Sequence, residues 1–263
     1  MEGADPDAHR YELEAYDIRT FVPEPVVGSA YDGRALLRIL ARKLAGKLSG
    51  GRFGEPASAR VAAVHAGLQV FDRPEHHMGG LAFGLDYPRV LNELGVGRAE
   101  RMHELCAGPG YIGYALLAAG WCDELVLSDI NPEPLSCARL TAAENGVAHR
   151  VSIYESDALD DIPAGERWDL VVANPPHFLP GPGTPEDIRV HDPGWSLHQR
   201  IYGSLGRHIE PGGLAVLSGN ERGSDPRRFE EMVVAGGGRV RAIHPGRDLR
   251  GRPNGLYYLL SEW

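Results

Sequence analysis

The segment of residues 102–118, MHELCAGPGYIGYALLA, constrains the fold more than any other part of the chain. Its first residues, Met102–Cys106, are typical of a strand, and a glycine-rich turn leads from them into an apolar helix. We predict this helix over Tyr111–Ala119, with Gly120 as its stop. Glycine is needed where a backbone turns sharply and a ligand lies against it. The segment therefore predicts a strand, a ligand-binding turn and a helix.

Strands and helices alternate along the chain after this turn. Further strands are predicted over 124–128, 150–154, 168–173 and 214–218, and helices over 132–145, 194–208 and 226–234. Asn131 and Pro132 are typical of a helix start. The last two strands, Arg239–His244 and Leu256–Ser261, have only a short loop between them and should pair as an antiparallel hairpin. The pattern predicts a doubly wound α/β fold with a mostly parallel, seven-stranded sheet.

The first 95 residues have a different pattern, and we predict two domains. Residues 1–95 form a helical and β-hairpin extension that serves as a lid or substrate wall, and residues 96–263 form the catalytic domain. Within the extension we expect a helix over Tyr31–Leu48, a strand over Arg60–Phe71 and a short helix over Tyr87–Leu94. Whether the extension is a lid or a dimer surface, and the oligomeric state, stay open.

Composition limits the classes of function. The chain is 43% apolar and has a formal net charge of -9. No apolar run is long enough to span a bilayer, so we expect no membrane association. The acidic charge does not favour a nucleic-acid partner, which calls for a basic surface. The acidic, polar start is unlike a signal peptide, and the cysteines at positions 106, 122 and 137 show neither a full disulfide set nor metal spacing. We therefore expect a cytoplasmic protein without a metal site.

The glycines and the next acidic residue form the first motif. Gly108, Gly110 and Gly113 fit a G-x-G-x-x-G turn, and Asp129 ends the following predicted strand. An acid at this spacing suits the hydroxyl pair of a ribose. The motif fits a nicotinamide-dependent dehydrogenase as readily as an enzyme that uses S-adenosylmethionine (SAM).

Two further features separate these possibilities. Glu104 precedes the turn, and a carboxylate there favours the cationic SAM over a pyrophosphate. Asn174-Pro175-Pro176-His177 follows the predicted strand 168–173, at the carboxyl edge of the sheet where ligands bind. The Asn174 side-chain oxygen and the Pro175 carbonyl could accept hydrogen bonds from a target nitrogen and aim its lone pair at a methyl group. The barrier would then be lowered by positioning.

These residues, in this order, resemble a class I SAM-dependent methyltransferase of the group with an Asn-Pro-Pro-aromatic motif. The resemblance covers residues 102–220 and implies a Rossmann-like methyltransferase fold and SAM as the cofactor. It implies that the amino-acid end of SAM is bound by Glu104 and by the turn residues Cys106, Ala107, Gly108 and Gly110. It further implies ribose binding by Asp129 and adenine binding by Ile130, Asp157 and Ala158. Asn174, which also borders the cofactor, and Pro175 would hold the nucleophile.

The sequence departs from the family pattern at the turn and at the catalytic motif. Cys106 and Ala107 stand where the family often has an earlier glycine, and His177 replaces the usual Tyr or Phe. Imidazole stacks on a planar target less well than a phenyl ring, but it can take a proton. We therefore expect an amine acceptor more than a planar base or amide, with His177 as a catalytic base.

The sequence predicts methyl transfer from SAM to a nitrogen of a small molecule, amino acid, peptide or protein. Candidate substrate contacts are His76, His77, His191 and Trp195. Three alternatives stay open. The chain could cyclise SAM through its own amine and release methylthioadenosine. It could be a dehydrogenase, or it could bind SAM without catalysis.

Overall fold

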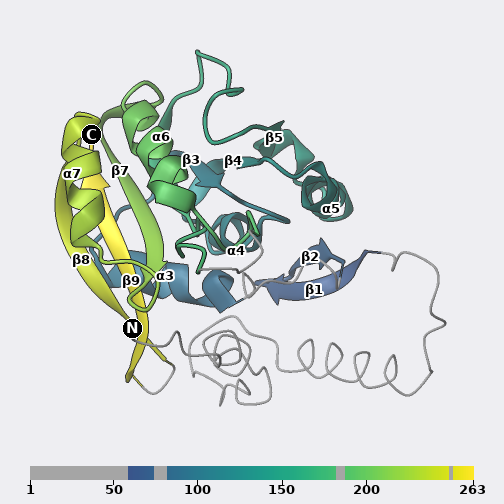
Figure 1. Cartoon of the computed structure of the whole chain (residues 1–263). Helices are drawn as coiled ribbons and strands as arrows, with labels where there is room; N and C mark the ends of the chain where they lie inside the picture. Colours follow the sequence, from purple (N-terminus) through teal and green to yellow (C-terminus); the bar gives the residue numbers. More distant parts are fainter. Residues whose placement is uncertain (1–58, 74–81, 182–186, 249–250) are drawn as a thin grey trace.

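The computed structural model describes residues 59–73, 82–181, 187–248 and 251–263. The predicted helix Tyr31–Leu48 and the candidate substrate residues His76 and His77 lie outside these ranges. The described chain forms one large sheet with helices on both faces and a small separate hairpin (Figure 1). No helix within the described residues is long and apolar enough to cross a membrane.

The large sheet has the predicted alternating pattern. Its strands are β3 (Ala99–Leu105), β4 (Cys122–Asp129), β5 (Val151–Glu155), β6 (Trp168–Ala173), β7 (Ile209–Asn220), β8 (Arg239–Arg247) and β9 (Pro253–Glu262). Their order across the sheet is β5-β4-β3-β6-β7-β9-β8. Neighbours from β5 to β7 are parallel, whereas β9 lies between β7 and β8 and is antiparallel to both. The predicted parallel sheet with a terminal antiparallel hairpin is confirmed.

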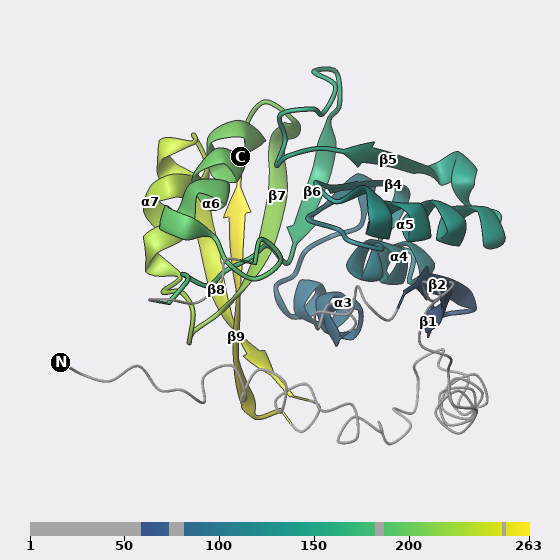
Figure 2. The same cartoon turned by 45° about the vertical axis from the view of Figure 1, so that its right-hand side comes forward.

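The helices divide between the two faces of the sheet. They are α3 (Phe83–Glu93), α4 (Tyr111–Ala118), α5 (Pro132–Glu144), α6 (Ser196–Leu205) and α7 (Arg227–Ala235). Figure 2 shows α6 and α7 on one side of the sheet and α3, α4 and α5 on the other. Each face has its own apolar core, with Tyr87, Ile112 and Leu116 on the side of α3, α4 and α5 and with Ile201, Tyr202 and Phe229 on the side of α6 and α7. Burial on both faces explains the apolar run Leu170–Ala173 of the central strand β6, whereas the neighbouring β3 carries the buried polar residues His103 and Glu104.

The β-hairpin expected within the extension is present as β1 (Arg60–His65) and β2 (Leu68–Asp72), and it replaces the single strand predicted over Arg60–Phe71. Ala66 and Gly67 form its turn with φ angles of 46° and 92°. The hairpin packs on α4 and α5, because the Tyr111 hydroxyl donates to Asp72 Oδ2 at 2.6 Å and the Asn145 side chain hydrogen-bonds the backbone of Gln69. The hairpin and α3 share the core on this face of the sheet, while the proposed boundary at residue 95 stays a prediction.

Parallel register brings the chemistry-bearing motifs to one edge. The carboxyl end of β3 is level with those of both neighbours, since Leu105 pairs with Ser128 on β4 and with Ala173 on β6. Asp129 in turn pairs with Glu155 on β5. The residues that follow these strands therefore meet at the carboxyl edge, where open α/β sheets bind ligands.

Candidate active site

The glycine turn connects β3 to α4 through a series of left-handed backbone conformations. Cys106, Gly108 and Gly110 have φ angles of 55°, 53° and 85°. Such angles are unusual for a residue with a side chain, so Cys106 holds a strained position where a glycine would fit without cost. Burial raises the pKa of the Cys106 thiol well above its usual value. The thiol is therefore protonated and is not a nucleophile at neutral pH.

Glu104 holds the first turn of α4. Its carboxylate accepts hydrogen bonds from the backbone N–H of Gly113 at 2.6 Å and of Ile112 at 3.3 Å. The side chain is 2% exposed, and burial raises its pKa to about 8 even though the two amides favour the charged form. The carboxylate thus fixes the helix start beneath the turn, and its contact with the amino-acid end of SAM stays a prediction.

Asp129 joins the end of β4 to the glycine turn. Its Oδ2 accepts the N–H of Gly108 at 2.7 Å, and its Oδ1 accepts the N–H of Asn131 at 2.9 Å. Burial raises the pKa of Asp129 despite these amide hydrogen bonds. The next residue, Ile130, is 49% exposed at the same edge. This pair fits the predicted ribose and adenine contacts.

Asp157 and Ala158 follow β5 in a short loop beside Ile130. The N–H of Ser156 donates to the carbonyl oxygen of Asp129 at 3.0 Å and ties this loop to the end of β4. Ala158 is buried with a φ angle of 54°. The Asp157 carboxylate pairs with Arg200 of α6 at 3.0 Å, a contact that the sequence does not predict.

Asn174 lies directly after β6, and residues of two other elements hold it in place. The Ser218 hydroxyl donates to its Oδ1 at 2.8 Å. The fully buried Tyr87 of α3 donates to the carbonyl oxygen of the preceding residue, Ala173, at 2.5 Å. Ser218 and Tyr87 were not identified from the sequence as part of the site. They hold the Asn174 amide while one lone pair of Oδ1 stays available.

The His177 side chain contacts the backbone of its own Asn-Pro-Pro-His motif. Its Nδ1 lies 2.8 Å from the Pro175 carbonyl oxygen, and because that oxygen only accepts, Nδ1 carries the proton. Burial lowers the pKa of His177 to about 4, although the hydrogen bond to Pro175 acts in the other direction. His177 is therefore neutral at physiological pH and too weakly basic to deprotonate an ammonium group efficiently. The predicted role as a catalytic base loses support.

The other two described candidate substrate residues, His191 and Trp195, are buried and contact other parts of the protein. His191 is 8% exposed and its Nδ1 accepts the N–H of Asp187 at 3.0 Å. Trp195 is 5% exposed and packs edge-on against Phe229 between α6 and α7. The contact with Phe229 of α7 is not revealed by the sequence pattern, and a contact of Trp195 with substrate stays a prediction.

A buried acid–histidine pair lies beside the Asn174–His177 motif, and the sequence does not predict that Asp192 pairs with His198. Asp192 Oδ2 and His198 Nδ1 are 2.7 Å apart, and the two side chains are 1% and 2% exposed. Asp192 also accepts the N–H of Leu197 at 2.8 Å, and its own N–H donates to the Phe178 carbonyl oxygen. Although burial opposes it, hydrogen bonding by His198 and Leu197 keeps the pKa of Asp192 below its usual value. The pair anchors the start of α6 to the loop that follows the Asn174–His177 motif.

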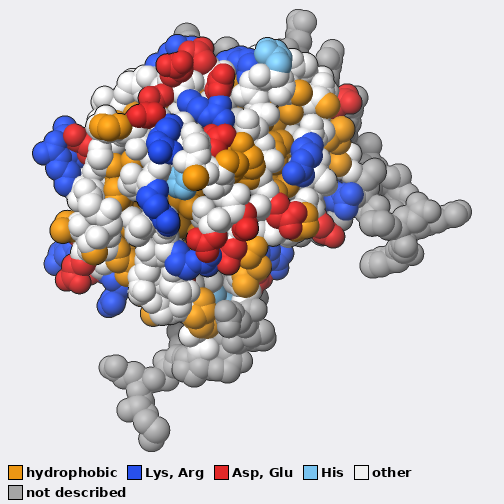
Figure 3. Space-filling view, turned by 90° about the horizontal axis from the view of Figure 1, so that it is seen from above, with side chains coloured by type: hydrophobic (Ala, Val, Ile, Leu, Met, Phe, Trp, Pro, Cys, Tyr) orange, Lys and Arg blue, Asp and Glu red, His pale blue; other side chains and the backbone are white. Residues whose placement is uncertain are grey.

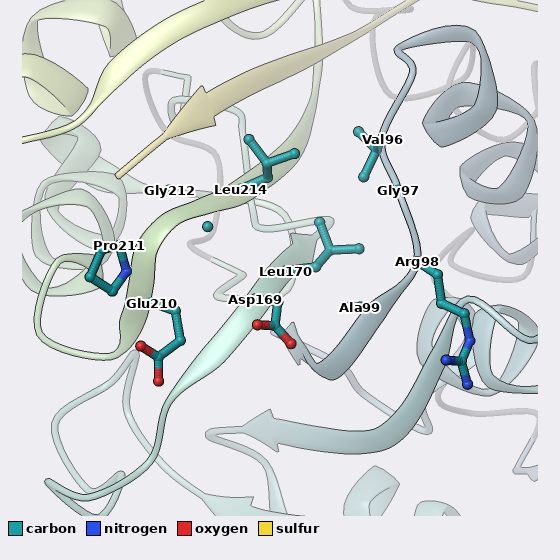
Figure 4. A pocket seen from close by; sticks show the side chains of 11 residues that line it. Val96, Gly97, Arg98, Ala99, Asp169, Leu170, Glu210, Pro211, Gly212 and Leu214 are labelled. Carbon is teal, nitrogen blue, oxygen red and sulfur yellow. The ribbon is translucent and has the colours of Figure 1, made fainter.

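A surface hollow of about 210 Å³ lies at the other end of the sheet. Its lining comes from the residues before β3 and from the first residues of β6 and β7. Figure 4 shows the Asp169 and Glu210 carboxylates in this region and Arg98 extended away from it. Asp169 already accepts the backbone N–H groups of Glu100 and Arg101. The hollow is thus separated from the carboxyl edge and contains none of the predicted site residues.

One face of the surface bears on the predicted partner class. Figure 3 shows basic and acidic side chains interspersed over that face, without a continuous basic stripe. A nucleic-acid backbone would be bound most readily by clustered Lys and Arg. This face therefore adds no support for a nucleic-acid acceptor.

Comparison with known proteins agrees with the fold. Residues 89–185 match the family model described as "Methyltransferase small domain". A release factor glutamine methyltransferase of Clostridium acetobutylicum is 27% identical over 148 residues, which cover 52% of this chain and 51% of that protein. A ribosomal protein uL3 glutamine methyltransferase of Burkholderia pseudomallei is 26% identical over 165 residues, 54% of this chain and 53% of the relative. The chain thus spans about half the length of these relatives.

Solved structures extend the likeness over most of the chain. A methyltransferase from Pyrococcus furiosus has a TM-score of 0.56 at 14% identity and covers 86% of this chain and 98% of its own. The 16S rRNA N2 G1207 methyltransferase of T. thermophilus, in complex with AdoMet and guanosine, has a TM-score of 0.56 at 17% identity and covers 81% and 52%. The chain therefore has the Rossmann-like fold of class I methyltransferases, with a methyltransferase small domain matched over residues 89–185.

Proposed function

We propose that the protein is a SAM-dependent methyltransferase whose acceptor is a side-chain amide nitrogen of a protein or peptide. The observation that carries the proposal is the position of Asn174 and Pro175. They follow β6, and the last residue of β6, Ala173, pairs with Leu105 at the start of the glycine turn. An acceptor held by these two residues would lie next to a cofactor held by the turn.

The proposed cofactor site consists of contacts from neighbouring strand ends. The turn after β3 lies next to Asp129, which accepts the N–H of Gly108, and Asp129 is followed by the exposed side chain of Ile130. Asp157 lies on the next strand end. This sequence of a glycine turn, a candidate ribose-binding acid, an exposed apolar side chain and a second acid suits an adenosine with an amino-acid arm. When bound, SAM supplies an electrophilic methyl group.

The acceptor is better matched by an amide than by an amine. An amine is mostly protonated at neutral pH and would need a base, but burial lowers the pKa of His177 to about 4. An amide nitrogen carries no such proton and has two N–H groups in one plane. The Asn174 Oδ1 and the Pro175 carbonyl could accept these N–H groups. This proposal reverses the expectation of an amine acceptor, and the glutamine methyltransferases among the relatives support it.

Catalysis would come from positioning. Two consecutive prolines restrict the backbone φ angles of the loop, and the hydrogen bond from Ser218 restricts Asn174. His177 steadies the Pro175 carbonyl through its Nδ1–H. Groups held in advance reduce the entropic barrier to an in-line transfer. The proton released by the methylated amide passes to solvent in this scheme, since no described residue at the motif is a strong base.

The dehydrogenase alternative is opposed by sheet topology. Dinucleotide-binding enzymes with a doubly wound fold have the parallel strand order 3-2-1-4-5-6. Here the antiparallel β9 is inserted between β7 and β8. The relatives give no support to SAM cyclisation or to a non-catalytic module. Cyclisation releases methylthioadenosine and a non-catalytic module forms no product, so product analysis distinguishes each from methyl transfer.

The test uses the full chain with SAM carrying a labelled methyl group. Bacterial release factor and ribosomal protein uL3, purified in unmethylated form, serve as acceptors, with a glutamine peptide and free glutamine beside them. We expect label in a protein or peptide, on a glutamine located by mass spectrometry, and S-adenosylhomocysteine as the other product. Label only on free amines would overturn the amide acceptor. Methylthioadenosine from SAM alone would indicate the cyclase, and binding of SAM without any product would indicate the non-catalytic module.

A further inference from the structure

Arg200 reaches from α6 to the loop that follows β5. One guanidinium nitrogen donates to Asp157 Oδ1 at 3.0 Å. The other donates to the backbone carbonyl oxygen of Asp157 at 3.0 Å and to Asp160 Oδ2 at 2.6 Å. A planar guanidinium that binds the side chain and the main chain of one residue restricts both its position and its rotamer.

The loop that carries Asp157 is also braced from within. Asp160 N–H donates to the Asp157 carbonyl oxygen, and Asp161 N–H donates to the Ser156 hydroxyl at 3.1 Å. The backbone N–H of Asp157 donates to Asp161 Oδ2 at 3.3 Å. These contacts fix the backbone of the loop, but none of them orients the Asp157 carboxylate. Arg200 does so.

One oxygen of the Asp157 carboxylate remains available. Arg200 occupies Oδ1, whereas no hydrogen bond to Oδ2 occurs among the described residues. The side chain is 49% exposed at the same edge as Ile130. An aromatic ring lying on Ile130 would therefore present its edge to Oδ2.

We propose that Arg200 is a positioning residue for cofactor selectivity: by holding Oδ1 of Asp157 it directs Oδ2 at the base, so that the site accepts a 6-amino purine and rejects a 6-oxo purine. This inference rests on the proposed function. An ionised carboxylate only accepts hydrogen bonds. The amino group of adenine donates to it, whereas the oxygen of hypoxanthine would place two lone pairs against each other.

The effect should appear in ligand binding more than in stability. Arg200 and Asp157 are 39% and 49% exposed, and exposed ion pairs contribute little to folding. Restricting a carboxylate before the ligand arrives lowers the entropic cost of forming its hydrogen bond. Loss of Arg200 should then weaken the adenine ligand selectively, with a small change in melting temperature.

The experiment measures calorimetric affinities of the full chain for S-adenosylhomocysteine and S-inosylhomocysteine. We expect the wild type to prefer the adenine compound by at least about tenfold. Arg200→Ala should bind that compound about three- to tenfold more weakly and lose most of the preference. Arg200→Lys should lie between them, since lysine keeps the charge but not the fork. Arg228→Ala, at an exposed arginine of α7, is the matched control.

The outcomes separate the inference from the function on which it rests. If the wild type binds S-adenosylhomocysteine and Arg200→Ala keeps the full preference for adenine, Arg200 has no positioning role and the inference is overturned. An equal weakening of both ligands together with a lower melting temperature also overturns it, because that result indicates a structural role. If the wild type binds neither ligand, the proposed function itself fails.

Discussion

The Nδ1 of His177 lies 2.8 Å from the carbonyl oxygen of Pro175, two residues earlier in the same motif. The imidazole therefore stabilises the group that we propose as an acceptor for the substrate N–H. Burial lowers the pKa of His177 to about 4, so the ring is uncharged at neutral pH. This arrangement assigns His177 to the support of the loop and not to proton transfer.

The first prediction concerns His177→Tyr. A tyrosine restores the aromatic residue of the resembled family, and we expect the variant to keep activity within about tenfold, since removal of a true general base costs roughly 100-fold or more. The rate of methyl transfer to the identified acceptor is measured across the neutral pH range. A loss of more than about 100-fold, reversed in part by added imidazole, would support His177 as the catalytic base after all.

Asn174→Ala tests the acceptor site. The variant removes the side-chain oxygen that Ser218 orients, so the target nitrogen loses one of its two fixed contacts. We expect turnover to fall at least about 100-fold while the affinity for S-adenosylhomocysteine stays within a few-fold. Single-turnover kinetics and calorimetry report the two quantities separately. If binding is abolished instead, Asn174 belongs to the cofactor site and the acceptor has been misplaced. Ser218→Ala should show a smaller effect of the same kind.

The glycines of the turn should respond differently to the same added methyl group. A Cβ on Gly108 would meet no atom within 4 Å, whereas a Cβ on Gly113 would lie 2.7 Å from Glu104 Oε2 and 2.8 Å from the side chains of Leu125 and Leu127. Gly108→Ala should cost about 1 kcal/mol of stability through its left-handed backbone and weaken cofactor binding at least about tenfold. Gly113→Ala should destabilise the fold by about 2 kcal/mol through overpacking.

Denaturant unfolding and calorimetry distinguish these two effects. Normal cofactor binding by a folded Gly108→Ala variant would mean that the ligand does not lie against the turn. Full stability of Gly113→Ala would mean that the contact between β3 and α4 adapts easily. In either case the glycine pattern alone would no longer support a binding turn.

Sequence patterns predict the bounds of an element well where a clear apolar run or a capping residue marks its ends. The apolar run of β6 gives both of its bounds, Trp168–Ala173, and Asn131 does cap α5 by accepting the N–H of Glu133. The hairpin turn is less visible, because Ala66 adopts a φ angle of 46° without a residue type that favours it. Local patterns fail at that point since tertiary packing of the hairpin selects the conformation.

The support of the site depends on contacts between distant residues. Arg200 and Asp157 are 43 residues apart, and Ser218 and Asn174 are 44 apart. A motif predicts which strand end carries the chemistry, but it does not say which side chain from another element orients it. Trp195 illustrates the converse, since its burial beneath α7 depends on how two helices pack. The strand ends that carry the candidate site were therefore predictable, whereas the residues that orient its side chains required the structure.

Glu104 should couple cofactor binding to a proton. Burial raises its pKa to about 8, so most ligand-free molecules carry a protonated Glu104 at neutral pH. A cationic ligand next to the carboxylate would lower that pKa and release the proton. We therefore expect the affinity for SAM to rise as pH rises from about 6 toward 8. Calorimetry in buffers of different ionisation enthalpy counts the released protons.

Glu104→Gln is the matched variant for this linkage. Glutamine keeps the size and can still accept the Gly113 N–H, but it does not titrate in this range. Its SAM affinity should be lower at high pH and should lose the part of the pH dependence that Glu104 contributes. A wild type that binds SAM equally from pH 6 to about 8 would contradict the predicted contact between Glu104 and the cationic end of the ligand.

The last prediction concerns the acid stability of the core around His103. The ring is fully buried, lies 2.7 Å from the Ser128 hydroxyl through Nε2 and packs at 4.1 Å from Trp168. Its Nδ1 is buried and has no hydrogen-bond partner among the described residues. Burial, with smaller effects from the nearby His208 and Arg101, lowers the pKa of His103 from 6.5 to about 3. A proton would therefore be bound by the unfolded chain before the folded one.

The sign follows from this order of proton binding. Between pH values of about 6.5 and 3 the unfolded state carries the proton and the folded state does not, so stability falls as pH falls through that window. The loss should reach about 3 kcal/mol near pH 4. His103→Leu should be less stable at neutral pH, because Ser128 loses its partner. Its free energy of unfolding, measured with denaturant, should nevertheless change less with pH than that of the wild type. His149→Leu, at an exposed histidine, should keep the wild-type slope. An unchanged slope in His103→Leu would mean that His103 ionises in the folded protein, with water or a shifted strand available to its Nδ1.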